Sequence, residues 1–151
     1  MTRSLSSDRR SFVGRESALA ALAIHGVPAT IRSANHAVIL ATGHCAADAS
    51  MDWASLARTG APIVLYMAVA NLPAIVDALM QGGLEGSTPA LVVHAATTSE
   101  ESVLEAPLER VPSLADGGAI RSPAVIAVGA VAAFRAAIAN HLLASGSEAA
   151  Q

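Results

Sequence analysis

The sequence predicts an α/β fold in which a mixed sheet is flanked by helices. Three of the expected strands are continuous apolar runs without alternation, which is typical of strands buried on both faces of a sheet. Segments with helical spacing separate these runs along the chain, as in layered α/β proteins. No internal repeat or low-complexity linker divides the 151 residues, a length typical of one domain. We place this domain at 12–144, between disordered tails at 1–11 and 145–151.

Turn and capping residues define the individual elements. Asn71 is a good N-cap for a helix that ends at the pair Gly82-Gly83, and Ser50 or Asp52 would cap the shorter helix before it. A weak strand pattern follows the polar loop near residue 100. Helices are therefore expected at 15–25, 51–58, 71–83, 109–114 and 132–144, and strands at 36–44, 62–67, 88–95, 103–108 and 122–131.

The composition argues against several classes of function. All nine basic residues are arginines, they are scattered, and the net charge is −3, so there is no basic stripe for nucleic acid. The longest apolar runs fall short of the ~18–20 residues that a membrane span needs. No secretory signal is evident, so we expect a cytoplasmic protein. A hydrophobic fraction of 53% allows a sizeable core and also an apolar surface that a partner covers.

No motif predicts metal or nucleophilic chemistry. The five histidines lack metal-binding spacing, and Cys45 is the only cysteine, so we expect neither a metal site nor an intrachain disulfide. The sequence contains no G-x-S-x-G and no glycine-rich phosphate loop. His44 ends an expected strand, where α/β proteins bind ligands, although an isolated histidine is more often a surface residue.

The pair Tyr66-Met67 allows two interpretations. Methionine fills gaps in cores and tyrosine packs at the ends of sheets, so the pair is explained by packing alone. The pair also stands at the carboxyl end of an expected strand and leads directly into a helix start at Asn71. In α/β proteins this position is the usual edge for a ligand, which favours the wall of a pocket.

Six blocks of the sequence follow the order of a known family. They read GVPATIRS, VILATGH, DWASLARTGAPIVLYMAVANLPAIVDALMQGG, TPALVVHAAT, PLERV and SPAVIAVGAV. From Ser17 to Val131 the chain resembles the C-terminal half of the tetrapyrrole methyltransferases, and among them the uroporphyrinogen-III C-methyltransferases of the sirohaem and cobalamin pathways. The resemblance implies two α/β domains with S-adenosylmethionine in the cleft between them.

The resemblance also implies roles for individual residues. Met67 aligns with a methionine that packs on the cofactor, Ala96 with a residue whose backbone contacts the adenosyl portion, and Ala124 with an alanine that lines the adenine. Glu16 and Ser17 align with a small polar pair at a helix start. The implied cofactor-binding residues are Met67, Ala96, Ala124, Ser17 and Glu16, and the implied substrate-binding residues are Tyr66, Arg32 and His44.

The chain also departs from the family pattern. Ile31 replaces a histidine, Glu101 replaces a loop glutamine, and Ala68 replaces a glycine, which removes backbone freedom at that turn. The family's N-terminal domain, with its glycine-rich loop and acid–base residues, has no counterpart in the sequence.

Two functions therefore stay open. The chain is either a tetrapyrrole C-methyltransferase that needs a complementary N-terminal domain chain or a homodimer partner, or a non-catalytic half-domain for dimerisation or cofactor binding.

Overall fold

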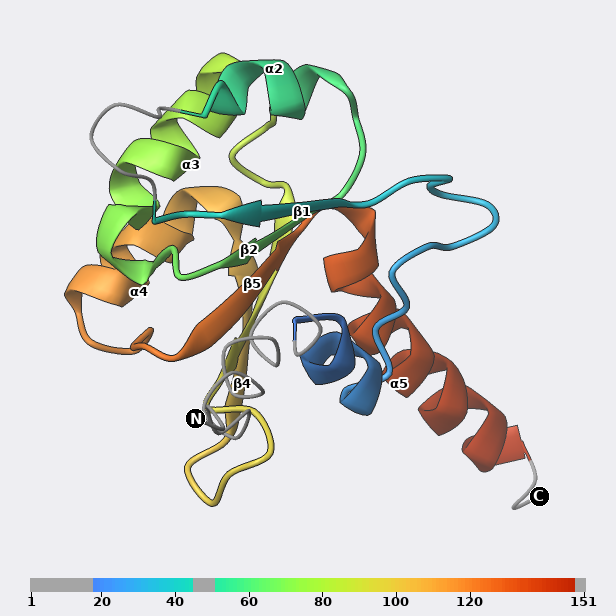
Figure 1. The fold of residues 1–151 in the computed structure, drawn as a ribbon. Coiled ribbons are helices and arrows are strands. Elements are labelled where there is room, and N and C mark those ends of the chain that lie inside the picture. The colour runs from blue at the N-terminus through green and yellow to red at the C-terminus, as the bar shows by residue number, and fades with distance from the viewer. Residues whose placement is uncertain (1–17, 45–50, 149–151) are drawn as a thin grey trace, which may run out of the picture.

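The computed structural model describes residues 18–44 and 51–148 and shows a sheet between two layers of helices (Figure 1). Residues 18–24 form the first described helix. The elements that follow are β1 (Ile39–Thr42), α2 (Trp53–Arg58), β2 (Ile63–Tyr66), the 3-10 turn η1 (Val69–Asn71), α3 (Leu72–Gln81), β3 (Pro89–His94), β4 (Ser102–Pro107), the 3-10 turn η2 (Leu108–Arg110), α4 (Val111–Asp116), β5 (Ala124–Val128) and α5 (Ala130–Glu148).

The described strands form one mixed sheet in the order β1-β2-β5-β3-β4. β1 and β2 are parallel, whereas the pairs β2–β5, β5–β3 and β3–β4 are antiparallel. The predicted α/β fold with a mixed sheet is therefore confirmed. These directions make β1, β2 and β3 end at the same edge of the sheet, where β4 and β5 begin. We call this edge the carboxyl edge.

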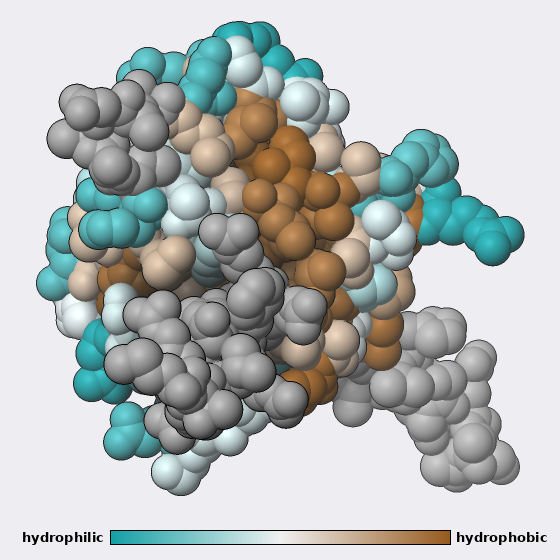
Figure 2. Space-filling model, viewed as in Figure 1, coloured by the Kyte–Doolittle hydropathy of each residue, from teal (hydrophilic) through white to brown (hydrophobic). Residues whose placement is uncertain are grey.

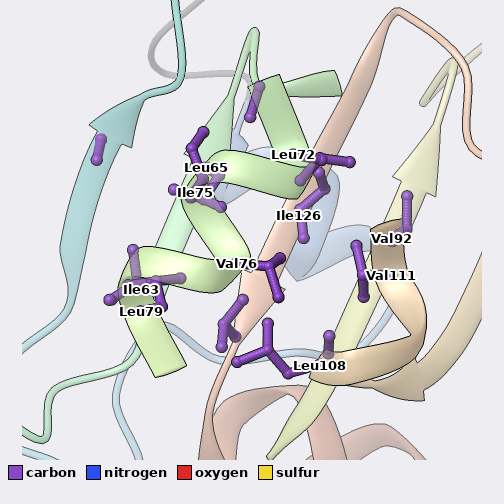
Figure 3. Packing of buried hydrophobic residues seen from close by; sticks show 14 of the residues in the cluster. Ile63, Leu65, Leu72, Ile75, Val76, Leu79, Val92, Leu108, Val111 and Ile126 are labelled. Atoms are coloured by element: carbon purple, nitrogen blue, oxygen red, sulfur yellow. The ribbon is translucent and has the colours of Figure 1, made fainter. Parts of the chain in front are cut away.

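Side chains alternate between the two faces of the sheet and build two cores. Ile63 and Leu65 of β2 pack with α3 and α4, whereas Val64 between them packs on the opposite face with helical residues 18–24 and α5. Each fully buried aliphatic side chain contributes about 1.5–3 kcal/mol. This double burial explains why the strands read as unbroken apolar runs. Figure 3 labels the main residues of the first core, which are Ile63, Leu65, Leu72, Ile75, Val76, Leu79, Val92, Leu108, Val111 and Ile126.

The last strand and the last helix differ from the predicted bounds. β5 is shorter than the predicted 122–131, because Pro123 has no N–H for the ladder and Gly129 leaves the strand conformation with a φ of 112°. α5 continues to Glu148, beyond the expected domain end at 144. None of the helices in the described part of the chain has both the length and the hydropathy of a membrane span.

Asp52 caps α2, as one of the two predicted caps. Its carboxylate accepts hydrogen bonds from the backbone N–H of Ser55, at 2.9 Å, and from the Ser55 hydroxyl. These donors, the hydroxyl above all, hold the pKa of the Asp52 carboxyl below its usual range.

Candidate functional site

The fold brings five of the predicted site residues to the carboxyl edge. His44 follows β1, Met67 follows β2, and Ala96 lies in the loop after β3. Ala124 begins β5, and the register places it beside the last residue of β3. Tyr66 is the last residue of β2. Segments that are far apart in the sequence therefore meet at one edge of the sheet.

The other three predicted residues are not placed there. Glu16 and Ser17 lie outside the described residues. Arg32 is exposed in a turn closed by the bridge between Ile31 and Asn35, ahead of β1. Within residues 18–44 and 51–148, no hydrogen bond or ion pair joins Arg32 to the carboxyl edge. Its assignment to a substrate therefore stays a prediction.

Tyr66 and Met67 differ in burial. The half-buried Tyr66 side chain packs against the core on the face of α5. The Met67 side chain is 61% exposed, although it lies in sequence between the half-buried Tyr66 and the fully buried Ala68. Its φ of 51° is left-handed, which costs a residue with a side chain about 1–2 kcal/mol. The chain thus presents an exposed thioether at the edge from a left-handed residue.

Contacts from β1 hold the Met67 turn in place. The N–H of Gly43 donates to the carbonyl of Tyr66 at 2.8 Å. A Cβ at Gly43 would overlap Cα and Cβ of Ala68, so the end of β1 lies directly on the turn. Asn71 adds a further tie, because its side-chain amide donates to the Gly43 carbonyl at 2.7 Å.

Two expectations about this turn are corrected by that arrangement. Asn71 occupies the N-cap position of α3, but its side chain makes no capping bond, since the amide is engaged with Gly43 instead. The replacement of a glycine by Ala68 does not strain the backbone, because the φ of Ala68 is an ordinary −102° and Met67 is the left-handed residue. The fully buried methyl of Ala68 fits because the facing residue is a glycine.

The loop after β3 is the second tightly held segment of the edge. Ala95 and Thr97, on either side of Ala96, are both left-handed, with φ values of 45° and 68°. The N–H of Ala95 donates to the carbonyl of Pro123 at 2.9 Å. His94 contacts the same carbonyl through Nδ1 at 3.1 Å, and the carbonyl of Arg121 at 2.9 Å. The loop that carries Ala96 is therefore joined to the segment that leads into Ala124.

His94 is a buried polar residue that joins these two segments, and the sequence did not reveal this contact. Both partners of Nδ1 are carbonyl oxygens, which accept only, so Nδ1 carries the proton. The sequence offered only an isolated histidine at the end of an apolar run. Its partners lie more than 25 residues along the chain, and only the antiparallel pairing of β3 with β5 brings them close.

The carboxyl edge offers binding groups more than reactive ones. Met67, Ala96 and Ala124 bring a thioether, main-chain groups and little bulk. In the part of the chain that the structure describes, no group of three or more His, Cys, Asp or Glu side chains could hold a metal ion. Such a surface can pack on a flat ring and offer hydrogen bonds from the backbone to its polar atoms.

Comparisons with known sequences agree with the order of these segments. A sequence profile described as Tetrapyrrole (Corrin/Porphyrin) Methylases matches residues 14–112. A siroheme synthase of Tolumonas auensis is 36% identical over 122 residues, which are 80% of this chain and 26% of that protein. A uroporphyrinogen-III C-methyltransferase of Pseudomonas aeruginosa is 33% identical over 118 residues, which are 78% of this chain and 48% of that protein. The chain therefore spans between about a quarter and about half of the length of these relatives.

Solved structures share the fold. A cobalt precorrin-4 methyltransferase superimposes with a TM-score of 0.69 over 77% of this chain and 49% of that protein, at 23% identity, which supports the fold alone. A uroporphyrin-III C-methyltransferase of Thermus thermophilus, solved in complex with S-adenosylhomocysteine, superimposes with a TM-score of 0.62. It is 30% identical, and the match covers 74% of this chain and 49% of that protein.

Proposed function

The chain belongs to the tetrapyrrole (corrin/porphyrin) methylase family, and on that premise we propose that its carboxyl edge binds S-adenosylmethionine for C-methylation of a tetrapyrrole. One observation carries the proposal. Met67, Ala96 and Ala124 come from three different segments of the sequence, and the order of the strands gathers them at one edge. The Thermus thermophilus relative that contains S-adenosylhomocysteine shares this fold.

The residues of the edge fit such a cofactor. The exposed Met67 thioether would pack on the adenosyl group, the Ala96 backbone would meet its polar atoms, and the small Ala124 leaves room for the adenine. Bound S-adenosylmethionine would supply an electrophilic methyl group. The chain's own part is then to position the reactants, which lowers the barrier without acid–base groups. We assign Tyr66 and His44, on the same edge, to the side of the tetrapyrrole.

In this proposal the catalytic pocket includes more than the described residues. The chain spans about half of the uroporphyrinogen-III C-methyltransferase relatives. We propose that the segments corresponding to their other half complete the cleft, so that this chain by itself binds the cofactor and does not turn over. Uroporphyrinogen III, named by those relatives, is the tetrapyrrole that we would test first.

The cofactor proposal is tested by calorimetric titration of the purified chain with S-adenosylhomocysteine. Met67→Ala should weaken binding at least tenfold. Met80→Ala is the matched control, because it removes a partly exposed methionine from α3, and it should leave the affinity unchanged. A wild-type dissociation constant above the millimolar range, which corresponds to a free energy weaker than about −4 kcal/mol, refutes cofactor binding.

Turnover is tested separately. The chain is incubated with uroporphyrinogen III and S-adenosylmethionine, and methylated product is sought by mass spectrometry. We expect none from this chain alone. Product formation would overturn the proposal that a further domain is required.

A dimerisation module is the second candidate, and the edge strand β1 favours it. Leu40 in this strand is 43% exposed, and Figure 2 shows apolar side chains gathered over β1 and the start of α5. A homodimer would cover this surface. Sedimentation analysis should show a dimer that Leu40→Lys dissociates, whereas Ile24→Lys, at another exposed position, should not. A wild-type monomer at micromolar concentration would exclude this candidate.

A further inference from the structure

Hydrogen bonds between residues three apart in the sequence close the loop from Ala95 to Glu101. The Ala95 carbonyl accepts from the Thr98 N–H at 3.1 Å and from the Thr98 hydroxyl at 2.7 Å. The Thr98 carbonyl in turn accepts from the N–H of Glu101 at 3.2 Å. These bonds fix the base of the loop. They leave the N–H of Thr97, one of the two left-handed residues beside Ala96, without a backbone partner among the described residues.

Glu101 supplies the partner for that N–H. Its Oε2 accepts from the Thr97 amide at 2.6 Å, a short distance that is typical of a hydrogen bond to a charged acceptor. The left-handed conformation of Thr97, with a φ of 68°, is intrinsically unfavourable for a β-branched residue. A strained residue of this kind persists only where its surroundings hold it. The carboxylate of Glu101 is the side chain that holds it here.

His25 lies against the other oxygen of the carboxylate. Its Nε2 lies 3.3 Å from the second oxygen, Oε1, of Glu101. Nε2 itself is buried and has no hydrogen bond of good geometry among the described residues, so its contact with the carboxylate is one of proximity and charge. The side chain of His25 is only 13% exposed and that of Glu101 only 26%, so the contact is largely shielded from water.

His25, Glu101 and Thr97 therefore link the first described helix to the carboxyl edge. His25 follows helical residues 18–24, which pack on the sheet face opposite α3, and Thr97 adjoins Ala96. We infer that Glu101 and His25 are positioning residues that hold the backbone of Ala96 in its binding orientation through the Thr97 amide. The inference rests on the proposed binding of S-adenosylmethionine at this edge, which it deepens.

The test compares variants that differ in the hydrogen-bond acceptor that they offer to the Thr97 amide. Glu101→Ala removes the acceptor and should weaken binding of S-adenosylhomocysteine about tenfold, in line with the loss of one charged hydrogen bond. Glu101→Gln keeps a carbonyl oxygen for Thr97 and should restore the affinity to within about threefold of wild type. His25→Ala should give an intermediate loss. Glu100→Ala, at the exposed neighbouring carboxylate, is the matched control and should bind like wild type.

A second measurement keeps this test separate from the proposed function. The amide proton of Thr97 is followed by NMR without any ligand. It should be shifted downfield and protected from exchange in the wild type and in Glu101→Gln, and it should lose both properties in Glu101→Ala. If neither the wild type nor any variant binds S-adenosylhomocysteine but the amide behaves in this way, the proposed function fails, whereas the hydrogen bond from the Thr97 amide to Glu101 is confirmed. An unchanged Thr97 amide in Glu101→Ala, or an unchanged affinity in that variant when the wild type binds, overturns the inference.

Discussion

Replacement of Gly43 by alanine tests whether the end of β1 lies on the Met67 turn as closely as the structure shows. Gly43 does not have a left-handed φ, so the substitution is not opposed by its own backbone conformation. The obstacle is space, because an added Cβ would overlap both Cα and Cβ of Ala68 and would lie 3.0 Å from Cδ1 of Ile75. The Cα of Ala68 belongs to the main chain and cannot rotate out of the way.

The magnitude follows from which atoms must move. Overpacking a well-filled core costs about 1–3 kcal/mol, and an overlap with backbone places Gly43→Ala at the upper end, near 3 kcal/mol. Ala68→Gly alone removes one buried methyl, worth ~0.8 kcal/mol, and adds the entropy cost of a glycine, about 0.5–1 kcal/mol. The double variant removes one of the two overlaps. Its loss should fall short of the sum by at least about 1 kcal/mol, since contacting residues couple.

Urea unfolding of the four proteins measures these losses. Gly117→Ala serves as a control, because this glycine has a φ of −74° and its added Cβ would meet nothing closer than the Ser113 carbonyl at 3.2 Å. The control should change the free energy of unfolding by less than about 1 kcal/mol. Loss of less than about 0.5 kcal/mol in Gly43→Ala, or strict additivity in the double variant, would refute the close packing of β1 on the turn.

Substitutions at three further positions test the edge and a cap. Met67→Gly should raise the free energy of unfolding by up to about 1 kcal/mol, because it relieves a left-handed φ, while it weakens S-adenosylhomocysteine binding as Met67→Ala does; calorimetry and urea unfolding separate the two effects. Asn71→Ala should cost about 1 kcal/mol in urea unfolding, and Asn71→Asp should cost more, because a carboxylate would then face the Gly43 carbonyl. Asp52→Ala should lower the melting temperature at neutral pH. Because the pKa of Asp52 is lowered in the fold, its carboxylate stabilises the fold above the usual carboxyl range, and this stabilisation disappears as the pH falls through the lowered pKa. The melting temperatures of the wild type and Asp52→Ala should therefore converge at acid pH.

The sheet was predictable from sequence because each strand carries its own signal. A run such as 62–67 is apolar on both faces and bounded by proline and a turn, which identifies a buried strand without knowledge of its neighbours. The ends of the elements were less predictable. The bounds of β5 depend on Pro123 and Gly129, and the cap of α3 depends on a competing partner for Asn71 that belongs to another strand. Local patterns do not contain that information.

The candidate site likewise has a part that the sequence predicts and a part that it does not. Met67 and Tyr66 stand at a strand end, and position along the strand was enough to select them. The contacts of His94, Gly43 and Glu101 could not be read from the sequence, because each depends on the approach of two segments. An isolated histidine, a glycine after a strand and a glutamate in a polar loop are common in any chain.

The location of backbone strain gives an argument for function that is independent of family membership. Among the described residues, the non-glycine residues with positive φ are Met67, Ala95 and Thr97, and all of them lie at the carboxyl edge. None lies in the two cores, where packing would be the simplest reason for strain. Each costs free energy, so the surrounding contacts must hold it: Gly43 on the first turn, and Pro123 and Glu101 on the second loop. Strain concentrated at the one edge where the strand order gathers an exposed thioether and small side chains is what a preorganised binding wall requires.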